Sequence, residues 1–273
     1  MRSHFAVLRA ADAVNNDCRA APQSRFRPAV RIAVFAIAIF AGFCAQVDVN
    51  ATRAQTPVSI ELVLAVDTSL SVDEVEFALQ MKGIAWAFRR PEIIALIGQR
   101  RRVAVTLFQW SSEVNRRFII PWHISHEPAT VLAFADEVEQ ATREPSRGFT
   151  AMGRAIDFAI DLIVGNPLAG RELKIDISAD GRSNVGPLPA AAWQRAEASG
   201  IVINGLPILV DTYNLDIYFL EKVITGPGAF VEIAADYDDF ARVFLRKLRR
   251  ELNPFITRND QVPDIALSSL GAP

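Results

Sequence analysis

Residues Ile60-Glu61-Leu62-Val63-Leu64-Ala65-Val66 run directly into Asp67-Thr68-Ser69-Leu70-Ser71. The first stretch is almost entirely apolar and rich in branched side chains, which is typical of a β-strand that is buried on both faces. The second stretch places one carboxylate and two hydroxyl groups at alternate positions. We therefore predict a buried strand whose carboxyl end presents oxygen-bearing side chains.

Strand and helix patterns alternate over the rest of the chain. Further strands are predicted at 103–110, 115–122, 173–178, 201–208 and 229–233, and helices at 73–88, 127–140, 151–164, 190–199, 216–223 and 236–252. Strands that alternate with helices of this length indicate right-handed crossovers and a mostly parallel sheet with helices on both faces. The prediction is one α/β domain in which residues 115–122 form an antiparallel edge strand.

The first residues have the pattern of an export signal. Arg25, Arg27 and Arg31 precede an apolar run over residues 32–45 that contains no charge. This run is shorter than the ~20 residues that a membrane span needs, and a basic flank before a short apolar core is typical of a signal peptide. Cleavage is expected after Ala54, with an uncleaved membrane anchor as the alternative.

This interpretation gives three parts: a signal peptide over residues 1–54, a domain over 55–252 and a flexible tail over 253–273. The cleaved protein is then expected to be periplasmic or secreted, with no stable membrane span. Residues 1–54 hold seven Arg, three Asp and both Cys of the sequence. The rest of the chain therefore carries 22 basic and 28 acidic side chains, a net charge of −6, and no disulfide. A nucleic-acid-binding protein usually carries a basic surplus, so this class is disfavoured.

Two more predicted loops carry oxygen atoms at the same edge of the sheet. Thr150 opens the helix predicted at 151–164, and Asp180 follows the strand predicted at 173–178. Ligands of parallel α/β sheets bind at the carboxyl ends of strands, where the strand order reverses. Asp67, Ser69, Ser71, Thr150 and Asp180 are therefore the candidate ligands of one metal ion.

Such a set of ligands suits a hard divalent cation. Mg²⁺ prefers oxygen ligands and retains several waters, so two carboxylates and three hydroxyl groups suffice and leave one side open. Mn²⁺ or Ca²⁺ would fit the same atoms. Taken singly, each motif has an ordinary explanation, because Ser71 with Glu74 fits a helix capping box and Thr150 fits a helix N-cap.

Asp67-Thr68-Ser69-Leu70-Ser71, Thr150 and Asp180 resemble the metal-ion-dependent adhesion site of von Willebrand factor A-type domains. The resemblance covers roughly residues 58–251, and Gly226-Pro227-Gly228-Ala229-Phe230 is similar to an uncharacterised, exported bacterial branch. It implies a Rossmann-like, doubly wound sheet of six strands and a bound Mg²⁺. It also implies that Ser69, Ser71 and Thr150 contact the metal, with Asp67 and Asp180 binding it directly or through water.

The resemblance implies a binding protein and not an enzyme. The cation would complete its shell with an Asp or Glu of a partner protein, whose identity the sequence does not give. Phe149 stands where many relatives have Gly, which leaves the specificity for the partner open. One alternative is a Mg²⁺-dependent hydrolase that uses the same site, and Asp176 is a poor candidate for its base because it lies in the middle of a buried strand. A second alternative is a structural domain in which the ion only tightens the fold.

Overall fold

The computed structural model describes residues 55–145, 148–210 and 212–253, without the side chains of residues 115–118. The predicted signal peptide over 1–54 lies outside the described residues, as does nearly all of the predicted tail over 253–273. The division into these three parts therefore stays a prediction. None of the described helices has the length and apolar character needed to cross a membrane.

Five strands form one sheet in the described part of the chain. They are β1 (Thr56–Asp67), β2 (Val103–Trp110), β3 (Val114–Ser125), β4 (Leu168–Ala179) and β5 (Ile201–Pro207), in the order β3-β2-β1-β4-β5. β3 runs antiparallel to β2 at one edge, and every other neighbouring pair is parallel. The mostly parallel sheet and its antiparallel edge strand are thus confirmed. The chain adds β2 and β3 on one side of β1 and then β4 and β5 on the other side. The strand order therefore reverses between β1 and β4.

The prediction of six strands is wrong for the described residues. Residues 229–233 make only one isolated bridge beside β5, between Gly205 and Val231. The side-chain oxygen of Asn204 accepts the backbone N–H of Phe230 at 3.0 Å. A side chain therefore takes a hydrogen bond that a continuous parallel ladder would draw from the backbone.

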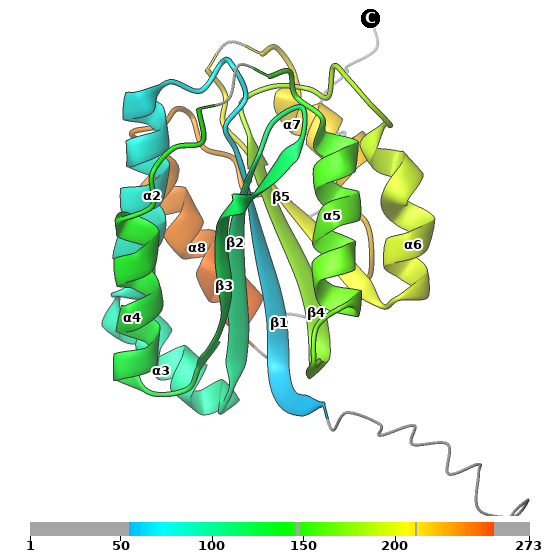
Figure 1. Cartoon of the computed structure of the whole chain (residues 1–273). Helices are drawn as coiled ribbons and strands as arrows, with labels where there is room; N and C mark the ends of the chain where they lie inside the picture. Colours follow the sequence, from blue (N-terminus) through cyan, green and yellow to red (C-terminus); the bar gives the residue numbers. More distant parts are fainter. Residues whose placement is uncertain (1–54, 146–147, 211, 254–273) are drawn as a thin grey trace, which may run out of the picture. The chain divides into compact units, whose positions relative to one another are not determined.

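Helices cover both faces of the sheet, as predicted (Figure 1). One face carries α2 (Glu74–Phe88), α3 (Pro91–Arg100), α4 (Pro128–Glu139) and α8 (Phe240–Leu252). The other carries α5 (Met152–Val164), the 3₁₀-helix η1 (Pro189–Ala192), α6 (Trp193–Ala198), α7 (Leu215–Tyr218) and the π-helical turn η2 (Phe219–Val223). Alternate side chains of β1 enter the two cores, Leu62 and Leu64 on the first face and Val63 and Ala65 on the second. Burial on both sides explains why β1 is apolar almost throughout.

Helix α3 was missed by the sequence analysis, which predicted a helix over residues 73–88 and no further helix before β2. Pro91 occupies the first turn of α3, where the lack of a backbone N–H removes no hydrogen bond. The helix α2 before it ends at Phe88, so only Arg89 and Arg90 separate the two. The proline therefore both stops one helix and starts the next.

A buried charged cluster fixes α8 on the sheet. The ammonium group of Lys247 lies 2.8 Å from Asp176 of β4 and 2.9 Å from Glu251 of α8 itself. Glu251 also accepts a 2.7 Å hydrogen bond from the side chain of Asn204 in β5. Lys247 is fully buried, so its charge depends on these carboxylates for compensation.

Candidate functional site

The two predicted acidic ligands lie at the carboxyl edge of neighbouring strands. Asp67 is the last residue of β1, and Asp180 directly follows β4. β1 and β4 pair in parallel up to Val66 and Ser178, so their ends meet at the same level. This is the point where the strand order reverses, which is the usual ligand position in an open parallel sheet.

Three predicted ligands form a direct chain of contacts with Asp180. The hydroxyl of Ser71 donates a 2.8 Å hydrogen bond to Oδ1 of Asp180, and it lies 3.3 Å from the hydroxyl of Ser69. Oδ1 of Asp67 accepts the backbone N–H of Ser69 at 2.7 Å, which fixes the turn after β1. The structure thus brings Asp180 against the turn that carries Asp67, Ser69 and Ser71, although 109 positions separate Ser71 from Asp180.

Thr150 joins this group through the loop before α5. The backbone N–H of Leu70 donates to the carbonyl of Gly148 at 3.1 Å, so this loop lies against the Ser69–Ser71 turn. A Cβ placed on Gly181 would lie 3.8 Å from the Thr150 hydroxyl oxygen, which puts that hydroxyl beside the residue after Asp180. The three loops therefore converge.

The ordinary explanations for Ser71 and Thr150 are contradicted. The capping box of α2 consists of Asp73 and Glu76, so Ser71 does not cap that helix. Helix α5 begins after Ala151 without a hydrogen bond from a capping side chain. Both hydroxyl groups are therefore available for another role.

The candidate ligands are buried on one side of the site and exposed to solvent on the other. Asp67 and Ser69 are each 1% exposed, Thr150 and Asp180 are 5–6% exposed, and Ser71 is exposed. A ligand bound by these atoms would therefore be enclosed by protein on one side and reachable from solvent on the other. An ion with one coordination position open to a second molecule needs this arrangement.

The carboxylate of Asp67 lacks the compensation that its burial requires. Its Oδ2 atom is buried and has no hydrogen-bond partner in the described part of the chain. Burial, and next the charge of Asp180, raise the pKa of Asp67 to about 8. Two acidic groups with an unpartnered buried oxygen between strand ends fit a divalent cation, which would supply the missing positive charge.

Two residues that support the site were missed by the sequence analysis. The phenol of Tyr237 donates a 3.1 Å hydrogen bond to Oδ2 of Asp180. The guanidinium of Arg143 donates to the backbone carbonyls of Thr68 and, at 2.6 Å, Val72, which flank the serine turn. Neither residue stands in a motif, and only the fold brings them to the strand ends, so the sequence held no signal for them.

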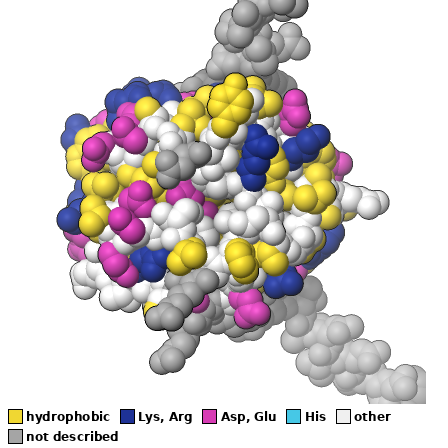
Figure 2. Space-filling view, turned by 90° about the horizontal axis from the view of Figure 1, so that it is seen from above, with side chains coloured by type: hydrophobic (Ala, Val, Ile, Leu, Met, Phe, Trp, Pro, Cys, Tyr) yellow, Lys and Arg dark blue, Asp and Glu magenta, His cyan; other side chains and the backbone are white. Residues whose placement is uncertain are grey.

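Large apolar side chains surround the open side. Leu70 is 69% exposed and Phe149 is 66% exposed, and each directly neighbours a predicted ligand in the chain. Tyr213, in the loop after β5, is 86% exposed. The view onto this end of the sheet shows apolar side chains gathered with acidic ones on one face (Figure 2).

Other candidate groups do not form a site. Asp176, considered as a hydrolytic base, is held in the ion pair with Lys247. His123 pairs with Glu137 at 2.6 Å on the surface. Among the described residues, no group of three or more His, Cys, Asp or Glu is placed to hold a metal. The candidate site holds two such residues, Asp67 and Asp180, and its other three candidate ligands are Ser and Thr.

Comparison with known proteins gives a family and a fold. The model of a family described as "Protein of unknown function (DUF1194)" matches residues 57–255. No curated protein sequence matches the chain. Its fold is similar to that of von Willebrand factor A domains in solved structures, at sequence identities that establish the fold alone.

Three solved structures illustrate the likeness. The pilus adhesin SpaC from Lactobacillus rhamnosus GG has a TM-score of 0.52 and 14% identity, over 71% of this chain and 30% of SpaC. Proximal thread matrix protein 1 from the mussel byssus has a TM-score of 0.53 and 13% identity, over 71% of this chain and 48% of that protein. The von Willebrand factor domain of the type V pili tip protein Mfa5 from Porphyromonas gingivalis has a TM-score of 0.50 and 12% identity, over 75% of this chain and 98% of that domain.

The match covers less than half of the first two proteins. A further structure of the mussel protein, with a TM-score of 0.50 and 9% identity over 73% of this chain and 47% of that one, has a zinc-occupied metal-ion-dependent adhesion motif. Chains with this fold therefore include one that binds a divalent metal ion.

Proposed function

We propose that this chain, which belongs to the family described as protein of unknown function (DUF1194), is an exported, metal-dependent protein-binding module. The module binds a divalent cation, Mg²⁺ in the first instance, through Asp67, Ser69, Ser71, Thr150 and Asp180. An acidic side chain of a partner protein completes the shell of the ion. The module has no catalytic role in this proposal.

The observation that carries the proposal is the unpartnered Oδ2 atom of Asp67 beside the Ser71–Asp180 contact. A buried carboxylate that keeps one oxygen without a partner is unfavourable by several kcal/mol unless it takes up a proton or a metal ion. The neighbouring hydroxyl groups add neutral oxygen ligands, so a bound ion keeps part of its positive charge. That charge would attract a carboxylate from outside.

The apolar rim supports a protein as the partner. Leu70 and Phe149 directly neighbour candidate ligands in the chain and are exposed, so a protein that reached the ion could also cover them. A protein segment with an acidic residue among apolar ones would satisfy both the ion and the rim. A small carboxylate alone would leave the rim in water.

Calorimetric titration of residues 55–273 with Mg²⁺ or Mn²⁺ tests the metal site. One ion per chain is expected for the unaltered protein and none for Asp67→Ala. Asp238→Ala, which removes an exposed acidic side chain outside the site, serves as the matched control and should bind as before. Absence of binding in the unaltered protein, or equal binding in Asp67→Ala, contradicts the proposal.

Binding of a partner is tested separately. Residues 55–273 immobilised on a resin should retain a protein from the exported fraction in Mg²⁺ and release it in EDTA. Asp67→Ala should retain nothing in either buffer. Retention that is unchanged by EDTA and by the substitution would show that binding does not use the ion.

Export is proposed from the basic and apolar pattern of residues 1–54. The solved structures with this fold include a pilus adhesin and a pilus tip protein, which supports a place outside the cytoplasm. N-terminal sequencing of the protein from cell fractions tests this point. A mature N-terminus after Ala54 is expected, and an intact N-terminus in the cytoplasmic fraction would contradict export.

A further inference from the structure

The end of the sheet opposite the candidate metal site carries a basic cavity. β1 runs the full length of the domain, and its twelve residues span about 36 Å at the usual rise of an extended strand. At its first residues lies a cavity of about 680 Å³. The charged and polar residues that line this cavity are Gln99, Arg100, Arg101, Arg102, Arg171 and Glu172.

The one carboxylate of this cavity is already engaged. Glu172 accepts a 2.6 Å hydrogen bond from Arg100 and lies 2.8 Å from the ammonium group of Lys174. Arg101, Arg102 and Arg171 are exposed and have no ion-pair or hydrogen-bond partner for their side chains among the residues described. Three guanidinium groups therefore line one cavity without compensation.

The backbone holds one of these arginines in an unfavourable conformation. Arg101 has φ 71° and ψ −46°, a region that favours glycine. A non-glycine residue there costs of order 1–3 kcal/mol, and such residues gather at functional sites. Glycine would relax this turn, so the local preference of the backbone does not account for an arginine at position 101.

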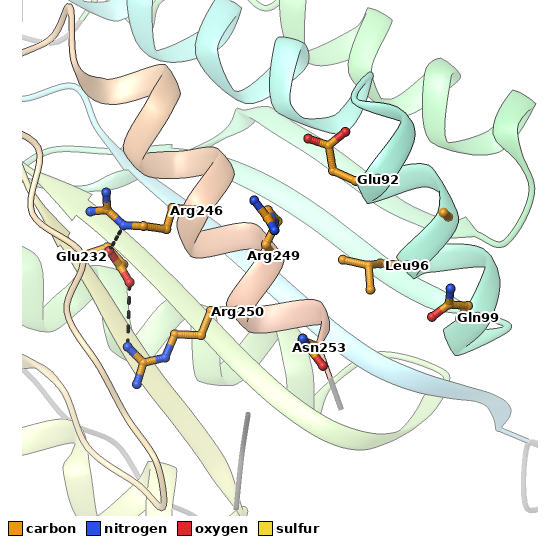
Figure 3. Close-up of a pocket in the computed structure, with 9 residues that line it drawn as sticks. Glu92, Leu96, Gln99, Glu232, Arg246, Arg249, Arg250 and Asn253 are labelled. Carbon is orange, nitrogen blue, oxygen red and sulfur yellow. Dashed lines mark hydrogen bonds and ion pairs between the residues drawn. The ribbon is translucent and has the colours of Figure 1, made fainter. Parts of the chain in front are cut away.

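A second cavity extends the basic surface. It has about 610 Å³, lies between α3 and α8, and shares Gln99 with the first. Its Arg246 and Arg250 lie 2.5 and 3.7 Å from Glu232, whereas Arg249 has no such partner in the described part of the chain. Figure 3 shows Arg249 on the side of α8 that faces α3, apart from the Glu232 ion pairs. We call Arg101, Arg102, Arg171 and Arg249 the basic pole.

The basic pole contrasts with the charge of the rest of the chain. Residues 55–273 carry a net charge of −6, so four unpaired cations at one end are a local feature and not part of a general surplus. Guanidinium groups bind phosphate and carboxylate oxygens in a two-pronged manner and are weakly hydrated, which suits them to anionic surfaces. The basic pole is therefore suited to an anionic ligand.

The position of the pole in the chain identifies the anionic surface. Pro57 and Val58, the start of β1, line the same cavity. The apolar segment over 32–45 ends ten residues before Thr56, and ten residues span at most about 36 Å. If that segment enters a lipid bilayer during export, before cleavage after Ala54, the length of the chain keeps the start of β1 within about 36 Å of the bilayer.

We propose that the basic pole binds the phosphate groups of an anionic phospholipid surface. In this orientation β1 points away from the bilayer, and the candidate metal site faces outward at the far end of the sheet. The domain then presents its partner-binding end to the surroundings while its opposite end rests on the membrane. This proposal does not depend on metal binding, so the two can fail separately.

Vesicle sedimentation with residues 55–273 tests the proposal. These residues lie within one compact unit with its own core. The protein should sediment with vesicles that contain phosphatidylglycerol and not with pure phosphatidylcholine. Binding should weaken as salt rises from 0.01 M to 0.1 M, where the screening length falls from about 30 Å to about 10 Å. Arg101→Gln/Arg102→Gln/Arg171→Gln should bind more weakly by roughly fivefold per guanidinium, on the order of a hundredfold in all.

The matched control is Lys82→Gln/Arg195→Gln/Lys222→Gln, which removes the same charge from exposed positions on α2, α6 and η2. It should sediment like the unaltered protein, and urea unfolding of both variants reports whether they are folded. Equal loss in the two variants, or unchanged binding in the first, overturns the proposal. So does calorimetric binding of inorganic phosphate without any sedimentation with vesicles.

Discussion

The phenol of Tyr237 donates a 3.1 Å hydrogen bond to Oδ2 of Asp180, although 57 positions separate the two residues. Tyr237 precedes α8, so this bond links the last helix of the fold to the carboxyl end of β4. Burial, and next the charge of Asp180, raise the pKa of Tyr237, so the phenol stays protonated and keeps its hydrogen for Asp180. Tyr237 therefore orients one carboxylate of the candidate metal site.

Tyr237→Phe is expected to weaken metal binding by about tenfold, since the loss of a group that orients a ligand typically costs 10–100-fold in affinity. The ring remains and the buried packing is kept. Titration with Mn²⁺ measures the effect, with Tyr213→Phe as the control because Tyr213 is exposed in a loop. An unchanged affinity in Tyr237→Phe would mean that Asp180 needs no such support.

Phe149→Ala is expected to weaken partner binding without changing metal affinity. The side chain is exposed beside Thr150, so its removal deletes apolar contact area but no ligand oxygen. Removing a large apolar anchor from an interface costs about 2 kcal/mol or more, which is roughly thirtyfold in affinity. Retention on the resin and Mn²⁺ titration give the two readouts. Val164→Ala, an exposed apolar residue at the end of α5, is the matched control.

Gly153→Ala is expected to destabilise the domain although alanine favours helices. A Cβ on Gly153 would lie 2.2 Å from the backbone oxygen of Pro187, in the loop that follows Asp180. Relief of such an overlap requires backbone movement, at about 1–3 kcal/mol. Gly98→Ala in α3 is the matched control, because no atom lies within 4 Å of its Cβ position. It should stabilise the domain by roughly 0.5–1 kcal/mol. Urea unfolding measures both, and equal effects would remove the steric argument.

The sequence predicts the parts of the fold that depend on local pattern. β2 begins and ends where predicted because Val103–Trp110 is a continuous buried run. β4 is longer than predicted because its first residues, such as Ala169 and Arg171, are exposed and carry no apolar pattern. The strand at 229–233 was predicted from apolar content alone, but the side chain of Asn204 takes a hydrogen bond that a continuous ladder would draw from the backbone, and no local pattern reveals this contact.

The same limit applies to the candidate site. The positions of the three loops that carry the candidate ligands could be predicted, because each loop follows or precedes a helix or strand with a clear sequence pattern. Tyr237 and Arg143 could not, since their roles arise from contacts with residues far away in the sequence. The same limit applies to the basic pole. The sequence shows that Arg101 and Arg102 are charged, but only the fold shows that their side chains lack partners among the described residues.

Lys247→Met is expected to destabilise the domain in a pH-dependent manner. Lys247 compensates Asp176 and Glu251 in the buried cluster beneath α8, and removal of one partner from a buried ion pair costs about 3–5 kcal/mol. Burial already raises the pKa of Asp176 to about 6, with Lys247 acting in the opposite direction. Without the ammonium group this pKa should rise further.

The sign follows from proton binding. In the variant, folded Asp176 binds a proton more tightly than the unfolded chain, whose Asp residues titrate near pH 3.9. The free energy of unfolding of the variant should therefore fall as the pH rises from about 4 through the folded pKa, and the deficit against the unaltered protein should be largest at pH 8 and smallest near pH 5. Urea unfolding at both pH values measures this, with the exposed Arg249→Met on the same helix as the control. A deficit that is equal at the two pH values would show that Lys247 contributes through packing and not through its charge.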